Sequence, residues 1–141
     1  MELLNRIEHP ETLTYPTNCT VGIFNSTDDA EDAILSLERV GFRESEMRLL
    51  EGEEGREAID INNSQQSLVP RLIRMAEKLL DTGEWTFLET VDNELQQGHL
   101  MLSVLTDNPE SKDKAVGVLH LHGAHTVKFF SRYYVEHFDA D

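Results

Sequence analysis

The sequence is poor in cysteine, in basic residues and in long apolar runs. Its single cysteine, Cys19, excludes an internal disulfide and a zinc site built from cysteines. Lysine and arginine number 12 against 27 aspartate and glutamate residues, which gives a net charge of −15. No stretch approaches the ~18 consecutive apolar residues of a membrane span. We therefore expect an acidic, soluble protein that binds neither nucleic acid nor membranes, because both carry negative charge that this protein repels.

The length and composition are those of one globular domain. A chain of 141 residues with 39% hydrophobic residues can bury a core without disulfides or a metal. Residues 1–16 have no basic start followed by a long apolar run, so no signal peptide is expected. The predicted location is the cytoplasm, where a lone cysteine stays reduced.

Hydrophobic periodicity predicts alternating strands and helices. Residues 1–17 are predicted to be an extended or loosely docked N-terminal arm, residues 51–66 a loop, and residues 131–141 an apolar tail that docks on the core or on a neighbouring subunit. Short β-branched and aromatic runs predict strands at 19–24, 47–50, 99–105 and 126–130. Helical spacing predicts helices at 26–40, from Ser67 to about 80, at 84–97 and at 108–122.

Two parts of the chain align when one is shifted by 82 positions. The shift places Ser26 on Asn108, and each of these residues is the predicted N-cap of a helix. It also places Ala33, Leu37 and Gly41 on Ala115, Leu119 and Gly123. Each copy reads strand–helix–strand, and each helix ends at a glycine that takes a left-handed backbone cheaply.

This repeat predicts the fold class. Two strand–helix–strand copies make an α/β (α+β) chain with a ferredoxin-like βαββαβ antiparallel sheet. The predicted organisation is the arm at 1–17 and a single domain at 18–141, with a helical insertion at about 51–97 between the copies. The two repeat helices cover one face of such a sheet, so the insertion, the tail or a second subunit must cover the other.

Segments in both halves of the chain resemble a known family. They are the run from Thr20 to Ile34 with Gly41-Phe42, and the segments 95–104 and 119–125. Over roughly residues 18–130 the chain is similar to the bacterial general stress or heat-induced stress protein domain family. Members are mostly of unknown biochemical function, so the resemblance implies a stress-type protein and no catalytic residues. Many members have an apolar, Gly- and Ala-rich insertion, whereas here it is charged and amphipathic.

Histidines are the candidate metal ligands. His120, His122 and His125 fall within six residues, and neutral imidazoles bind zinc, copper and nickel. Residues two apart on a helix point to different sides, which opposes joint ligation by His120 and His122. His122 also aligns with Val40 of the repeat, a position that favours a packed histidine near a helix end. The sequence therefore leaves a metal site and a structural cluster as alternatives, with no cofactor expected.

No catalytic residues are predicted. Cys19 has no cationic neighbour in sequence to lower its pKa, which is typical of a small buried hydrophobe. The acidic run of Glu51, Glu53, Glu54 and Glu57 lacks the spacing of a calcium loop. Gly52 and Gly55 precede no Lys-Ser/Thr pair that would make a phosphate loop.

Three readings of the function follow from these observations. The first is a non-enzymatic protein of the general-stress type that self-associates, with a dimer favoured, or that binds a protein or small ligand. The alternative is a small-ligand or metal-binding regulatory domain with a site near Trp85, His99 and His122, between the open sheet face and the inserted helices. A small enzyme is the third reading, and the lack of a nucleophile–base–acid group opposes it.

Overall fold

The protein combines helices with an antiparallel sheet. The computed structural model describes residues 2–9, 18–59, 84–131 and 135–138. The elements run in the order α1 (Glu2–Arg6), β1 (Cys19–Phe24), α2 (Thr27–Arg39), the 3₁₀ turn η1 (Glu44–Glu46), β2 (Met47–Glu51), α3 (Gly52–Ile59), α5 (Glu84–Gln96), β3 (Leu100–Leu105), α6 (Pro109–Leu121), β4 (His125–Phe130) and β5 (Val135–His137). The α+β class predicted from the sequence is confirmed.

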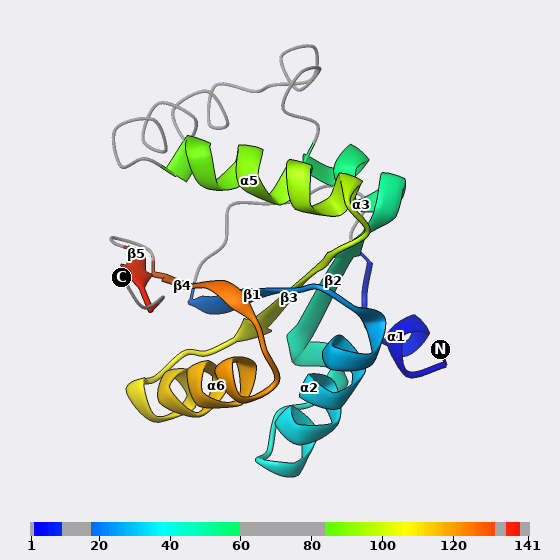
Figure 1. Ribbon diagram of the computed structural model, residues 1–141. Coiled ribbons are helices and arrows are strands. Elements are labelled where there is room, and N and C mark those ends of the chain that lie inside the picture. Colours follow the sequence, from blue (N-terminus) through cyan, green and yellow to red (C-terminus); the bar gives the residue numbers. More distant parts are fainter. Residues whose placement is uncertain (1, 10–17, 60–83, 132–134, 139–141) are drawn as a thin grey trace.

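The strands form one sheet in the order β2-β3-β1-β4-β5, and every neighbouring pair is antiparallel. The helices lie on both faces of this sheet (Figure 1): α2 and α6 pack on one face, and α3 and α5 cover the other. The inserted segment therefore covers the face that the repeat helices leave open, as one of the sequence-based alternatives proposed.

The larger core lies between the sheet and helices α2 and α6. Gly22 makes the close approach of α6 possible, because a Cβ there would lie 3.1 Å from the Ala124 Cβ and 3.3 Å from Leu119 Cδ1. The buried residues of this core are Leu4, Ile7, Phe24, Ala30, Ala33, Ile34, Leu37, Phe42, Met47, Leu49, Leu100, Leu102, Val104, Ala115, Leu119, Ala124 and Val127.

The predicted helix caps are confirmed. Ser26 accepts a hydrogen bond from the backbone N–H of Asp29 at 3.1 Å, and Asn108 accepts one from Ser111 at 2.8 Å. These side chains satisfy N–H groups that the first turn of a helix leaves without partners.

Two segments near the sheet edge differ from the sequence-based interpretation. The predicted loop at 51–66 is wrong for residues 52–59, which form α3. Glu53 and Glu54 lie in its first turn, where negative charge favours a helix start. Gly55 lets this helix contact β2, because a Cβ at Gly55 would lie 3.1 Å from the Leu50 carbonyl carbon. Gly55, one of the glycines that suggested a loop, instead permits close helix packing.

The N-terminal segment is packed rather than loose over residues 2–9. Leu4 and Ile7 of this segment are buried in the core. The carbonyl of Glu8 accepts a hydrogen bond from the Leu49 N–H at 2.8 Å, beside the edge strand β2. An extended or loosely docked arm is therefore wrong for this part. Residues 10–17 lie outside the described residues, as does the helix predicted from Ser67.

The described part of the tail docks on this chain's own sheet. Strand β5 pairs with β4, and Glu136 accepts a 2.6 Å hydrogen bond from the Lys112 ammonium of α6. The Lys112 ammonium also lies 5.1 Å from the ring centre of Phe129. Of the two docking partners expected for the tail, the structure shows the chain's own core for residues 135–138.

Candidate metal centre

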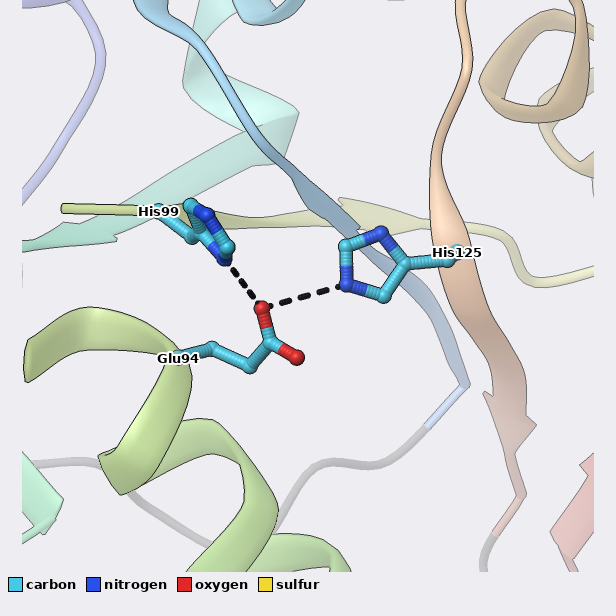
Figure 2. A group of neighbouring side chains, drawn as sticks. All are labelled: Glu94, His99 and His125. Atoms are coloured by element: carbon cyan, nitrogen blue, oxygen red, sulfur yellow. Dashed lines mark hydrogen bonds and ion pairs between the residues drawn. The ribbon is translucent and has the colours of Figure 1, made fainter. Parts of the chain in front are cut away.

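Three side chains from separate elements converge on the face of the sheet covered by α5. Glu94 comes from the last turn of α5, His99 directly precedes β3, and His125 opens β4. Figure 2 shows the Glu94 carboxylate rising from α5 toward both imidazole rings. One potential ligand atom from each residue lies within 4.8 Å of the other two. Among the described residues, no other three His, Cys, Asp or Glu side chains have ligand atoms this close together.

The end of helix α5 places His99 beside Glu94. The Gly98 N–H bonds to the Leu95 carbonyl at 3.1 Å, and the His99 N–H bonds to the Glu94 carbonyl at 3.0 Å. Gly98 has a φ of +89°, so the pattern is a Schellman motif. In this motif the residue after the glycine donates its backbone N–H to the carbonyl of the residue five positions earlier, so the two residues lie side by side. Local helix capping therefore brings the two side chains together.

A β-bulge turns His125 toward the same point. In the β1–β4 pair, Val21 faces Lys128 but Ile23 faces His125, so β4 carries one extra residue. Without this residue His125 would lie opposite Phe24 and face the α2–α6 core, because side chains alternate along a strand. Within the bulge Thr126 has a φ of +55°. Bulges of this kind re-aim side chains beside functional sites.

The left-handed backbone at Thr126 is strained. A β-branched residue rarely adopts a positive φ, and such a conformation costs about 1–3 kcal/mol. The surrounding structure holds this conformation, and its local consequence is the direction of the His125 side chain. Strain maintained at a side-chain cluster is a recognised indication of function.

One carboxylate oxygen connects both histidines. Glu94 Oε1 accepts a hydrogen bond from His99 Nδ1 and lies 3.2 Å from His125 Nε2. The two rings meet edge to face, with centroids 6.2 Å apart and planes at 85°. The side chains of Glu94, His99 and His125 keep 20%, 22% and 37% of their surface exposed. The cluster is therefore half-buried and open to solvent.

The environment keeps the Glu94 carboxylate charged. Burial raises the pKa of Glu94, but the hydrogen bonds and positive charges of His99 and His125 outweigh it. The net pKa of Glu94 lies below its ordinary value. Metal ligation also requires an ionised carboxylate, together with neutral imidazoles that have given up this positive charge.

The arrangement suits a borderline transition metal. Two imidazole nitrogens and one carboxylate oxygen are ligands of Zn²⁺ and related ions, with bonds near 2.1 Å. In tetrahedral geometry, such bonds hold neighbouring donors about 3.4 Å apart. The 3.2 Å between Glu94 Oε1 and His125 Nε2 already matches this spacing. The three donors lie within 4.8 Å, so shifts of about 1 Å would complete the set.

The histidines predicted together as ligands are separated. His125 joins the cluster, whereas His120 is exposed on α6. His122 caps the end of α6, and its Nε2 lies 2.7 Å from Ser36 Oγ of α2. This contact lies in the helix layer across the sheet from α5 (Figure 1). The position of His122 therefore agrees with the predicted alternative of a histidine packed near a helix end. His99 and His122 lie on opposite sides of the sheet and do not share a site.

The other candidate residues fall in different places. Trp85 lies in the first turn of α5, and its side chain is outside the described part of the structure. Cys19 is buried at the start of β1. Of the acidic run predicted as a loop, Glu51 ends β2 and Glu53 lies in α3 beside Arg56 at 3.1 Å.

Glu94 is the candidate ligand that the sequence interpretation missed. The sequence did contain a signal for Glu94, because Gly98 was predicted to end a helix. A Schellman motif at that glycine places the residue after it, His99, beside Glu94. The bulge at Thr126 had no such signal, because Thr favours ordinary strands.

Comparisons with known protein families, curated proteins and solved structures found no match to this chain. The resemblance to the general stress protein family therefore stays a prediction. Within the described residues, no helix has both the length and the apolar character needed to cross a membrane.

Proposed function

We propose that this chain is a metal-binding domain whose Glu94, His99 and His125 hold a divalent transition-metal ion. The observation that carries the proposal is the convergence of three ligand atoms within 4.8 Å from α5, the start of β3 and β4. The proposal refines the alternative predicted from the sequence. It keeps His99 of that site and His125 of the separate histidine set, adds Glu94, and leaves out Trp85, His120 and His122.

The Glu94–His125 ion pair alone contributes too little to offset the strain at Thr126. A partly exposed ion pair contributes about 0.2–1 kcal/mol, whereas the left-handed Thr126 that aims His125 costs about 1–3 kcal/mol. The strain thus exceeds what the Glu94–His125 pair returns. Metal ligation supplies a larger interaction at the same position, and this difference favours a functional ligand set.

The donor types restrict the class of ion that the cluster would bind. Mixed imidazole and carboxylate ligands favour Zn²⁺, Co²⁺, Ni²⁺, Cu²⁺ or Fe²⁺, whereas Ca²⁺ and Mg²⁺ prefer oxygen ligands throughout. The net charge of −15 raises the local concentration of cations around the protein. The charge that opposes nucleic acids therefore supports a cationic ligand.

The proposed fold is ferredoxin-like, with α3 and α5 as the inserted layer. The strand order β2-β3-β1-β4 and the two strand–helix–strand halves support this arrangement. A non-enzymatic action, a place in the stress response, and self-association as a homo-oligomer, with a dimer favoured, stay predictions from the sequence.

Isothermal titration calorimetry with Zn²⁺ and Co²⁺ tests metal binding on the untagged full chain. The expected result is one ion per chain. His125→Ala removes one of three ligands and should weaken binding more than ~100-fold, because loss of supporting contacts alone costs about 10–100-fold. Glu94→Gln keeps the side-chain size, removes the charge and should weaken binding strongly.

His120→Gln is the matched control, because it removes an exposed histidine outside the cluster. It should bind the metal as the unchanged protein does. Equal binding by the unchanged protein and by His125→Ala, or no binding at all, would contradict the proposed site. Circular dichroism of each variant establishes that the fold is retained.

A further inference from the structure

We infer, on the basis of the proposed metal site, that the bound ion keeps a coordination position for a small donor from solution. The expected ligand is water, which a small neutral nitrogen donor or a singly charged anion displaces. The site would then be an open binding centre rather than a structural cross-link.

The number of donors is the first argument. Structural zinc sites close the ion with four protein ligands, whereas open sites use three and leave a position for water or substrate. Among the described residues, the cluster contains three donors: two histidines and one glutamate. Two imidazoles with one carboxylate is the ligand pattern typical of open centres.

Access is the second argument. The outermost ligand, His125, keeps 37% of its side-chain surface exposed, and Glu94 and His99 keep about a fifth. A structural ion is commonly enclosed by its ligands, but here solvent reaches all three side chains. Figure 2 shows the carboxylate approaching both rings from the α5 side.

Charge limits the class of ligand. A divalent ion with one carboxylate and two neutral imidazoles keeps a single positive charge, which attracts one small anion. The protein's net charge of −15 repels polyanions such as nucleotides. The ligand that fits both conditions is small and carries no more than one negative charge. Azide and imidazole are probes of this class.

The test uses the full chain loaded with one equivalent of Co²⁺, whose visible absorption reports the atoms bound to the ion. Titration with azide, and separately with imidazole, should change the spectrum saturably and reversibly. His120→Gln should show the same change. His99→Ala should lose both the Co²⁺ spectrum and the response to azide, which assigns the response to this cluster.

Two results would overturn the inference, and they differ in meaning. If calorimetry shows one Co²⁺ per chain but neither probe changes the spectrum, the ion is closed and the proposed metal-binding function still stands. If Co²⁺ does not bind, the open position and the proposed function fail together.

Discussion

The two faces of the sheet differ in the side chains that they carry. The face under α2 and α6 carries the larger core, which is formed by apolar side chains. The face under α3 and α5 carries a smaller apolar cluster and, beside it, polar groups in contact with one another. Its buried apolar residues are Val21, Ile23, Leu50, Val91, Leu95, Met101 and Phe130.

The polar part of the α5 face includes more than the histidine cluster. Arg56 of α3 lies 3.0 Å from Asp92 of α5, and this pair links the two inserted helices. The comparison shows that one face holds the repeat halves together, while the other combines a smaller apolar cluster with the solvent-accessible side chains of Glu94, His99 and His125. Strain such as that at Thr126 persists only where the surrounding structure over-determines the conformation.

The largest expected effect is a difference in stability loss between two leucine substitutions, one in the apolar core on each face of the sheet. Leu119→Ala, in the α2–α6 core, should lower the free energy of unfolding by about 4 kcal/mol, near the top of the range for buried leucines. Leu95→Ala should cost about 2 kcal/mol, because its smaller cluster can collapse around the cavity. Urea denaturation measures both.

Leu121→Ala is the control on α6, since this side chain is 77% exposed and should change stability by less than about 0.5 kcal/mol. Equal losses for Leu119→Ala and Leu95→Ala would contradict the difference between the faces.

The next effect concerns the close approach of α6. Gly22→Ala should destabilise the protein by about 1–3 kcal/mol, because its Cβ would lie 3.1 Å from the Ala124 Cβ. Gly117→Ala, within α6, meets nothing within 4 Å and should stabilise by about 0.5–1 kcal/mol. Thermal unfolding of the two variants should therefore shift in opposite directions. A tolerated Gly22→Ala would show that the layer is less tightly packed than the structure indicates.

The third effect tests the strain on the α5 side of the sheet. Thr126→Gly should raise stability by about 0.5–1 kcal/mol, because glycine removes the left-handed penalty of about 1–3 kcal/mol. The chain entropy that glycine adds to the unfolded state offsets part of this gain. Thr126→Ala keeps a Cβ and should bring no such gain. Denaturant titration compares them, and a lower stability for Thr126→Gly than for Thr126→Ala would argue against the strained bulge.

The smallest effect depends on pH. The pKa of Glu38 is raised, mainly by burial. A hydrogen bond with Glu44 and the negative charge of Glu44 raise it further. A raised folded-state pKa means that Glu38 stabilises the fold below its unfolded pKa, and that this contribution is lost as pH rises through the folded pKa. Glu38→Gln should therefore stabilise by about 0.2–0.5 kcal/mol at pH 7, and the gain should vanish near pH 3.

Asp32→Asn, on the same helix, changes the net charge equally and serves as the control for Glu38→Gln. A gain at pH 7 that is identical for both variants would assign the effect to overall charge rather than to Glu44.

Much of the fold was predictable because its signals are local. Ser26 and Asn108 cap their helices as predicted. The left-handed glycines at 41, 98 and 123 follow the ends of α2, α5 and α6. Helix α3 was missed because Gly52 and Gly55 suggest a loop, and the sequence does not show that Gly55 packs closely against Leu50.

The candidate site was predictable in part. His99 and His125 were both proposed, but in different sets, and Glu94 was absent from each. Their meeting depends on the register of β1 with β3 and β4, in which Ile23 faces both Met101 and His125. A one-residue change of register turns a side chain to the other face, and sequence patterns seldom specify a bulge.

The sequence by itself determined the α+β class, the repeated halves, the helix caps and the acidic charge, because each depends on neighbouring residues or on composition. Only the tertiary structure decided which histidines meet. Capping places His99 against Glu94, but the bulge at Thr126 brings in His125 from 31 positions away in the chain. The physical reason is that strand pairing, not sequence spacing, sets the distance between those side chains.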